Sequence, residues 1–176
     1  MFQSDFDYAF KTIVGFEGKD SDHPDDRGGR TRYGISKRAY PYIDMDALTL
    51  GDAKQIYKRD YWNICGAKEM TTRDLKVLLF DIAVNHGAGR ARIMLQEALN
   101  LLNNNGKLYD DLEIDGIIGR KTKAAIKANE PHYIIMALIT KRLALMDRIA
   151  DGTSQEAFAK GWMNRYFSFI SNKGTA

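Results

Sequence analysis

The sequence predicts a mainly α-helical protein. Its 176 residues include only three prolines, so few positions forbid a helix. Strand-like alternation of Val, Ile and Thr is scarce, whereas apolar residues recur at helical spacing. The hydrophobic fraction of 44% and the charged fraction of 28% are ordinary for a globular protein, so one well-formed core is expected.

The first helix is expected over about residues 4–17, where apolar positions fit one helical face and Ser4 can serve as the N-cap. Residues 18–35 follow as irregular chain with a short hairpin, because a proline and the Gly28-Gly29 pair interrupt them.

Three further helices are expected in the middle of the chain. Thr49 opens one that runs to about Trp62, with an aspartate three residues after the threonine. The next begins after Thr72 and stops near Gly87, and another begins near Gly89.

The last third begins with a polar turn at residues 103–111 and a tight loop at 115–119. Helices are expected over 121–127 and over about 131–150, where the proline fits the first turn. A capping box at 153–156 predicts the start of a final helix.

The formal net charge of +3 is unevenly distributed. Residues 17–26 carry five acids and one lysine, a net −4, while the remainder has 25 basic and 18 acidic residues and carries +7. A basic body around an acidic loop suits a polyanionic partner that is cut at the loop. Nucleic acid, an anionic cell wall and a membrane surface all fit, as does a basic body without such a partner.

Cys65 is the only cysteine, so no internal disulfide is possible, and beside Trp62 it is expected to be a small buried hydrophobe. The acidic N-terminal stretch lacks the apolar run of a secretory signal, and no stretch is long enough to span a bilayer. Synthesis in the cytoplasm is therefore expected.

The sequence lacks the motifs of several common kinds of functional site. The acidic loop does not fit a calcium-binding EF-hand, because Pro24 stands where the third ligand would be. Zinc motifs, a nucleophile elbow and a phosphate-binding loop do not occur, and the basic residues show no nucleic-acid-binding signature. The sequence predicts no metal, no organic cofactor and no nucleic-acid partner.

One group of residues carries a specific chemical prediction: Glu17, Asp26 and Thr31. Glu17 follows an apolar run, which would raise its pKa and keep it protonated as a general acid. Asp26, on a polar loop, would stay ionised and bind a water that the Thr31 hydroxyl helps to hold. This is the two-carboxylate chemistry of glycoside hydrolysis, and a merely solvated acidic loop is the alternative.

The run from Glu17 to Ile35, E-G-x7-D-x-G-G-x-T-x-x-G-I, resembles the signature of glycoside hydrolase family 108. These are N-acetylmuramidases found as phage endolysins and as bacterial proteins once labelled secretion activators. The resemblance implies that Glu17 is the catalytic acid. The similar spacing in phage-type lysozymes implies that Asp26 and Thr31 position the nucleophilic water.

Two further segments extend this resemblance to about residues 10–170. Residues 81–100 resemble the family pattern D-x-x-V-N-x-G-x-x-x-A-x-x-x-L-Q, and residues 115–126 resemble the D-G-x-x-G-x-x-T element of a peptidoglycan-binding fold. The implied architecture is a lysozyme-like helical fold with a short irregular or hairpin segment. Residues 1–80 would form the catalytic part, and residues 81–176 a small helical peptidoglycan-binding subdomain packed onto it.

The sequence departs from the family pattern at Lys19 and Asp20, where a glycine and then an aromatic residue are usual. A residue that stacks on the glycan is therefore expected elsewhere, at Tyr33 or Tyr61. The other candidates for substrate binding are Gly28, Gly29 and Asn85, although glycines can serve backbone geometry and Asn85 can cap a helix.

The resemblance implies a peptidoglycan hydrolase that cleaves the β-1,4 bond between N-acetylmuramic acid and N-acetylglucosamine. As a phage endolysin it would be made in the host cytoplasm, reach the periplasmic wall through a holin-made lesion and cause host cell lysis. It is expected to be a monomer without stable membrane association. A non-catalytic peptidoglycan-binding or phage structural protein and a bacterial wall-remodelling secretion factor are the alternatives.

Overall fold

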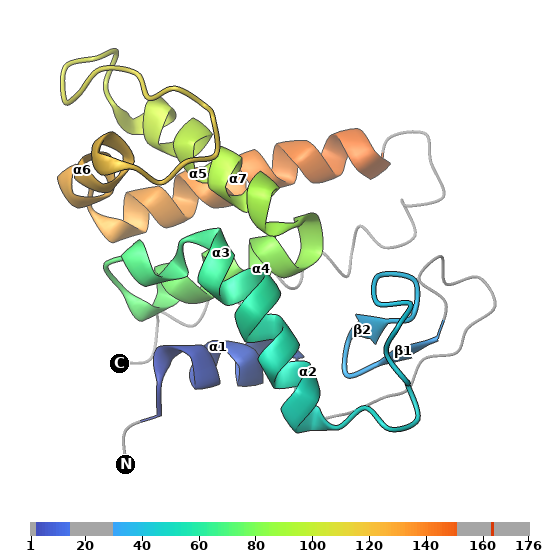
Figure 1. Ribbon diagram of the computed structural model, residues 1–176. Coiled ribbons are helices and arrows are strands. Elements are labelled where there is room, and N and C mark those ends of the chain that lie inside the picture. The colour runs from blue at the N-terminus through green and yellow to red at the C-terminus, as the bar shows by residue number, and fades with distance from the viewer. Residues whose placement is uncertain (1–2, 15–29, 151–162, 164–176) are drawn as a thin grey trace.

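The computed structural model describes residues 3–14, 30–150 and 163. The described chain is mostly helical with one two-stranded hairpin, which confirms the predicted fold class (Figure 1). The elements are α1 (Asp5–Val14), β1 (Thr31–Arg32), β2 (Ile35–Ser36), α2 (Leu50–Tyr57), the π-helix η1 (Lys58–Trp62), α3 (Asn63–Cys65), the 3-10 helix η2 (Ala67–Glu69), α4 (Arg73–His86), α5 (Ala88–Leu102), α6 (Arg120–Ala128) and α7 (Pro131–Ala150).

The predicted helix starts are confirmed by their caps. Ser4 Oγ accepts a hydrogen bond from the N–H of Asp7 at 3.1 Å. Thr49 and Asp52 form a reciprocal capping box at the start of α2, and Thr72 caps α4. The predicted end of the first helix near residue 17 and the helix expected to start at 153–156 lie outside the described residues.

The helix predicted from residue 49 to Trp62 is present, but it is not uniform. After α2 the chain widens into the π-helix η1, and α3 then ends at Gly66 in the left-handed region with a φ of +89°. A Cβ on Gly66 would lie 2.0 Å from Cδ1 of Ile118, so a glycine is needed here for close approach as well. A π-turn accommodates one additional residue, which a 3.6-residue periodicity cannot reveal.

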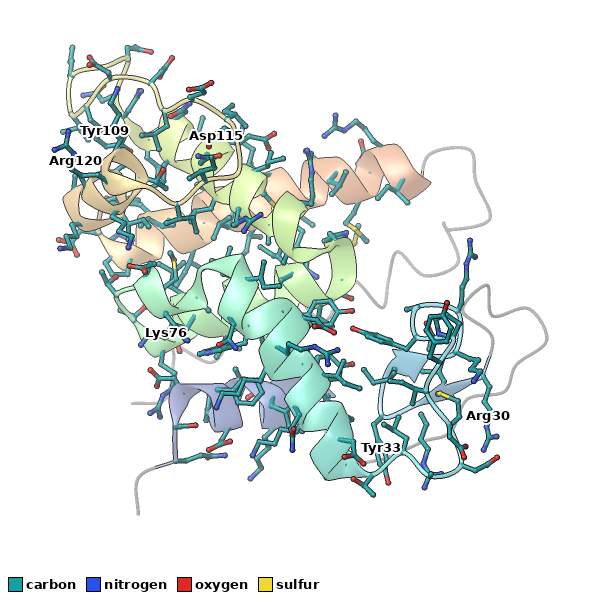
Figure 2. All side chains as sticks on the ribbon, viewed as in Figure 1. Arg30, Tyr33, Lys76, Tyr109, Asp115 and Arg120 are labelled. Atoms are coloured by element: carbon teal, nitrogen blue, oxygen red, sulfur yellow. The ribbon has the colours of Figure 1, made fainter. Side chains whose placement is uncertain are left out.

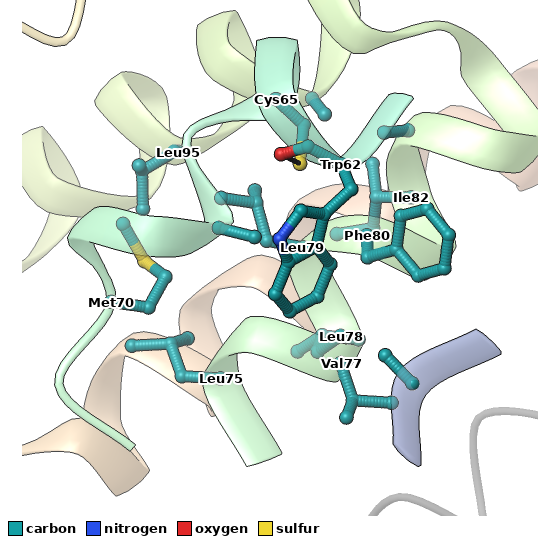
Figure 3. Packing of buried hydrophobic residues seen from close by; sticks show 14 of the residues in the cluster. Trp62, Cys65, Met70, Leu75, Val77, Leu78, Leu79, Phe80, Ile82 and Leu95 are labelled. Atoms are coloured by element: carbon teal, nitrogen blue, oxygen red, sulfur yellow. Dashed lines mark hydrogen bonds between the residues drawn. The ribbon is translucent and has the colours of Figure 1, made fainter. Parts of the chain in front are cut away.

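The core is organised around α4, which packs against α1, α5 and α7. The Trp62 ring lies 5.4 Å from the rings of both Phe6 and Phe80, and Cys65 is fully buried in the same cluster (Figure 3). Burial raises the pKa of the Cys65 thiol to about 11, so this side chain behaves as a buried apolar group. The expectation of a buried Cys65 beside Trp62 is confirmed.

In the described part of the C-terminal half, α5 and α7 pack against each other and α6 lies beside α5. Gln96, buried on α5, accepts from the N–H of Gly116 at 2.7 Å and donates to Asp115 at 2.8 Å, which fixes the tight loop before α6. Lys123 on α6 pairs with Glu69 of the N-terminal half at 2.9 Å.

One buried apolar cluster runs through both halves. The predicted division between residues 80 and 81 falls inside α4 and stays a prediction. None of the helices among the described residues has the length and apolar character needed to cross a membrane.

Candidate functional site

Half of the predicted site residues lie in the described part of the chain. Glu17, Asp26, Gly28 and Gly29 lie outside it. The described candidates come from three elements, namely the hairpin, the π-helix η1 and the end of α4, and they are Thr31, Tyr33, Tyr61 and Asn85.

Thr31 is held at the start of a tight hairpin. It pairs with Ser36 across the two antiparallel strands, and the turn between the strands is formed by Tyr33 and Gly34. These two residues have φ values of +52° and +76°, the positive angles that a type I′ two-residue hairpin requires. A Cβ on Gly34 would lie 2.3 Å from the Tyr57 hydroxyl, so the turn also depends on the missing side chain.

The chain after the hairpin folds back and braces it. The guanidinium of Arg32 donates to the carbonyls of Met45 at 3.1 Å and Asp46 at 2.9 Å. Arg30 pairs with the Asp46 carboxylate at 2.6 Å, and this hydrogen bond lowers the pKa of Asp46. The two arginines on either side of Thr31 therefore anchor this part of the hairpin to the loop at Met45 and Asp46.

Tyr33 lies at the hairpin turn and Tyr61 lies on η1. Both rings are half-buried, and both pack against the edge of the core. The Tyr61 ring lies 5.6 Å from the Tyr57 ring, and the Tyr57 hydroxyl faces Gly34 at the hairpin turn. Arg30 and Tyr33 lie on the hairpin side of the molecule, away from Asp115 and Arg120 (Figure 2). Stacking of either tyrosine on a sugar stays a prediction.

Asp60 is a carboxylate near this site that sequence reasoning missed. Tyr40 donates to Asp60 Oδ2 at 2.9 Å, and Arg59 donates to both carboxylate oxygens at 2.5 and 2.7 Å. The hydrogen bond from Arg59 lowers the pKa of Asp60. Burial and hydrogen bonding with Tyr61 and Asp60 raise the pKa of Tyr40. Asp60 therefore connects the loop after the hairpin to the π-helix as an ionised acceptor, and it is not poised to act as an acid.

A hollow of about 480 Å³ lies between this loop and α2, close to Asp60's partners. Thr31, Tyr33 and Tyr61 are not among its lining residues, which are Tyr40, Ile43, Asp44, Ala47, Leu48, Asp52, Gln55, Ile56 and Arg59. Within the described ranges, no cluster of three or more His, Cys, Asp or Glu side chains could hold a metal ion.

Asn85 lies at the C-terminal end of α4, on a different element from the hairpin. Its exposed side chain donates from Nδ2 to the carbonyl of Asp81 at 2.8 Å. Asp81 in turn pairs with Arg142 of α7, and both are buried. Burial and the charge of Arg142 lower the pKa of the adjacent His86 to about 4, so this imidazole is neutral near neutral pH.

Comparisons with known proteins cover most of the chain, including every candidate site residue. The family model of glycosyl hydrolase 108 matches residues 10–87, and the family model of a predicted peptidoglycan domain matches residues 90–167. A solved structure of Brucella abortus SagA is 30% identical, covers 95% of this chain and 92% of that chain, and superposes with a TM-score of 0.75. No curated protein matches the chain.

Proposed function

Because the chain belongs to the glycosyl hydrolase 108 family, we propose that it is an N-acetylmuramidase. Membership of the family makes it a glycoside hydrolase, and the peptidoglycan domain that follows makes peptidoglycan its partner. The bond proposed to be cleaved is the β-1,4 linkage between N-acetylmuramic acid and N-acetylglucosamine. The observation that carries this proposal is the order of the two matches, hydrolase first and peptidoglycan domain second, in one chain.

Glu17 is proposed to protonate the leaving glycosidic oxygen. Asp26, with the Thr31 hydroxyl, would hold the attacking water or stabilise the oxocarbenium-like transition state. The described hairpin supports the part assigned to Thr31, because the pairing with Ser36 and the contacts of Arg30 and Arg32 fix the strand on which that hydroxyl sits. A hydroxyl that orients water has to be held in place before the substrate arrives.

In this proposal residues 1–80 supply the chemistry, and residues 81–176 supply the surface that binds the wall. The biological role proposed is that of a phage endolysin. It would be made in the host cytoplasm, released by a holin and act on the periplasmic wall as a monomer without stable membrane association. The second candidate is a bacterial wall-remodelling factor, and the similarity to a protein of Brucella abortus favours it.

Mass spectrometry of digested peptidoglycan sacculi tests the proposed reaction. A muramidase releases fragments that end in reducing N-acetylmuramic acid. A glucosaminidase leaves reducing N-acetylglucosamine, and a lytic transglycosylase leaves a 1,6-anhydro sugar. Sacculi incubated with the Glu17→Gln protein are the control. Anhydro or N-acetylglucosamine ends as the main product would contradict the proposal, and binding without any product would favour the non-catalytic alternative.

A further inference from the structure

The hollow between α2 and the loop after the hairpin has an apolar floor. Leu48 and Ile56 line it and belong to the buried core, and Ile43 lines it half-buried against that core. Its volume of about 480 Å³ falls in the range of small-molecule sites. Because this floor is part of the closely packed core, the hollow keeps its shape without a ligand.

Two carboxylates on the lining are each fixed by one oxygen and offer the other. Asp44 Oδ1 accepts from two main-chain N–H groups, at 2.9 and 3.4 Å. Asp52 Oδ2 accepts from the N–H of Thr49 at 3.1 Å and from its hydroxyl at 2.5 Å. Within residues 3–14 and 30–150, no hydrogen bond or ion pair engages Asp44 Oδ2, Asp52 Oδ1 or the Gln55 amide. The hollow therefore presents two available carboxylate oxygens and an amide beside an apolar floor.

This part of the surface is acidic, although the chain as a whole carries +3. Asp44, Asp52 and Arg59 line the hollow. Arg59 is paired with Asp60 at 2.5 Å, so the three acids and one arginine together give −2. The hydrogen bond from Thr49 lowers the pKa of Asp52, which stays ionised at neutral pH. Carboxylates around an apolar floor suit a primary ammonium at the end of an aliphatic chain.

The walls of the hollow are held in place by hydrogen bonds. The Tyr40 hydroxyl donates to Asp60 at 2.9 Å, and the Lys37 ammonium donates to the main-chain carbonyl of Ile43 at 2.7 Å. Polar groups that are ordered beforehand lose less entropy when a ligand binds. Lys37 directly follows β2, so the loop that forms one wall begins at the hairpin that carries Thr31. A ligand in the hollow would therefore lie close to the strand assigned to the chemistry.

Peptidoglycan offers one group with the matching chemistry. Its glycan strands carry hydroxyl, acetamido and lactyl groups, whereas its stem peptide carries a diamino acid whose free amine ends an aliphatic chain. We propose that the hollow binds this diamino acid of the stem peptide. Asp44 and Asp52 hold its ammonium group. Its aliphatic chain lies over Leu48 and Ile56. The inference rests on the proposed function for its ligand, and it adds a peptide-binding site to a hydrolase that cleaves glycan.

Two soluble probes test whether the amine is recognised. The first is N-acetylmuramoyl-tripeptide with diaminopimelate as its third amino acid, and the second is the same compound with the free amine acetylated. Neither contains a β-1,4 glycosidic bond, so neither can be cleaved by the proposed reaction. NMR titration of wild type should give a Kd about tenfold lower for the free amine than for the acetylated probe.

Two neutralising variants assign this preference to the hollow. Asp44→Asn and Asp52→Asn each keep an oxygen that can accept the existing hydrogen bonds and remove one charge. Each should raise the Kd of the free-amine probe about three- to tenfold, and the double variant should bind the two probes equally. Asp110→Asn removes an exposed acid from the turn at residues 103–111, so this control should keep the full preference.

A third variant tests the space and leaves every charge in place. Ala47→Phe adds a ring to the lining of the hollow and should raise the Kd of both probes about tenfold or more. Its Tm should match wild type because Ala47 is exposed. Wild-type affinity in Ala47→Phe would overturn the placement of the ligand in this hollow.

The charge assignment has its own contrary results. Equal Kd values for the two probes in wild type would overturn the inference. So would an undiminished preference for the free amine in the folded Asp44→Asn/Asp52→Asn protein.

The probes also separate this inference from the proposed reaction, because their binding needs no turnover. If wild type releases no sugar from sacculi, the muramidase proposal fails, and a preference for the free amine that depends on Asp44 and Asp52 still supports the site. If wild type releases reducing N-acetylmuramic acid ends and binds the two probes equally, only the inference fails.

Discussion

Gly34 stands at the turn of the hairpin that carries Thr31, with a φ of +76°. The Tyr57 hydroxyl occupies the space that a Cβ on Gly34 would need. Gly34→Ala should lower the free energy of unfolding by about 2 kcal/mol or more, since it adds backbone strain to a steric clash. Gly51→Ala, in the first turn of α2, is the control, because the added Cβ would make only an ordinary 3.6 Å contact with the side chain of Thr49, the N-cap of that helix. Urea denaturation should show Gly51→Ala gaining about 0.5–1 kcal/mol. Equal losses in the two variants would contradict the role assigned to the turn.

The role of the Thr31 hydroxyl can be tested separately from the volume of the Thr31 side chain. Thr31→Val keeps the volume and removes the hydroxyl, so kcat on peptidoglycan should fall about tenfold or more if that group orients the water. Thr31→Ser restores the hydroxyl and should stay within about threefold of wild type. Full activity in the Val variant would remove Thr31 from the chemistry.

Single residues were predictable where the physics is local. Ser4 caps the first helix through its own hydroxyl, and Cys65 beside Trp62 is buried as a small apolar group. Arg142 was not predictable, because a charged residue on a long helix reads as exposed. Its burial is offset by the pairing with Asp81, 61 residues away in the sequence. Asp81 sits within an otherwise apolar run, which is a local signal, whereas Arg142 directly follows Lys141 and carries no such signal.

At the scale of elements, α1 is attached to its neighbours by two acids in its first turn. Asp5 pairs with Arg73 at 2.8 Å and with Lys76 at 2.6 Å, and Asp7 pairs with Lys54 at 2.6 Å. The hydrogen bond from Lys76, followed by that from Arg73, lowers the pKa of Asp5. These pairs are partly exposed, so each contributes modestly.

The pH dependence of stability tests this attachment. A carboxyl whose pKa is lowered by folding contributes stability above its unfolded pKa of about 3.9, and that contribution is lost as the pH falls through the folded value. Asp5→Asn should therefore cost about 0.5–1 kcal/mol near neutral pH and almost nothing well below pH ~3. Denaturation of the exposed-acid control Asp110→Asn should follow wild type throughout. A loss in Asp5→Asn that is independent of pH would contradict the ion-pair account.

The π-helix η1 shows what element prediction misses. The sequence indicated a helix through Lys58–Trp62, and a helix is there, but its widened turn was not foreseen. That turn carries Asp60, which the Tyr40 hydroxyl reaches at 2.9 Å, and Tyr61, which packs on Tyr57. Tyr40, which reaches Asp60, comes from a loop 20 residues earlier, and helical periodicity cannot reveal a contact at that separation.

On the scale of the molecule, the pair Asp81–Arg142 joins α4 to α7 across the core. Arg142→Met should lower the free energy of unfolding by about 3–5 kcal/mol, because it leaves a buried carboxylate without this partner. Replacing both charges, in Asp81→Leu/Arg142→Met, should recover most of that loss. Calorimetry checks the two variants, and a double variant no more stable than Arg142→Met would contradict the account.

The mainly helical class and the order of the helices followed from apolar spacing and caps, which are properties of short segments. The way the two halves share α4 did not follow, because it depends on contacts between distant residues such as Asp81 of α4 with Arg142 of α7. The candidate site likewise has one part that the sequence predicted and another that only the fold shows. Thr31 was recognisable from its motif, whereas the braces from Arg30 and Arg32 and the tether of Asn85 required the fold.

The central claim is that the molecule hydrolyses peptidoglycan with Glu17 as its acid. The most direct measurement is the release of reducing sugar from purified sacculi by wild type and by Glu17→Gln, with both proteins shown to be folded and to sediment with the sacculi. The account predicts release by wild type and a loss of at least about a hundredfold in Glu17→Gln with binding retained. Equal release by the two proteins would contradict it.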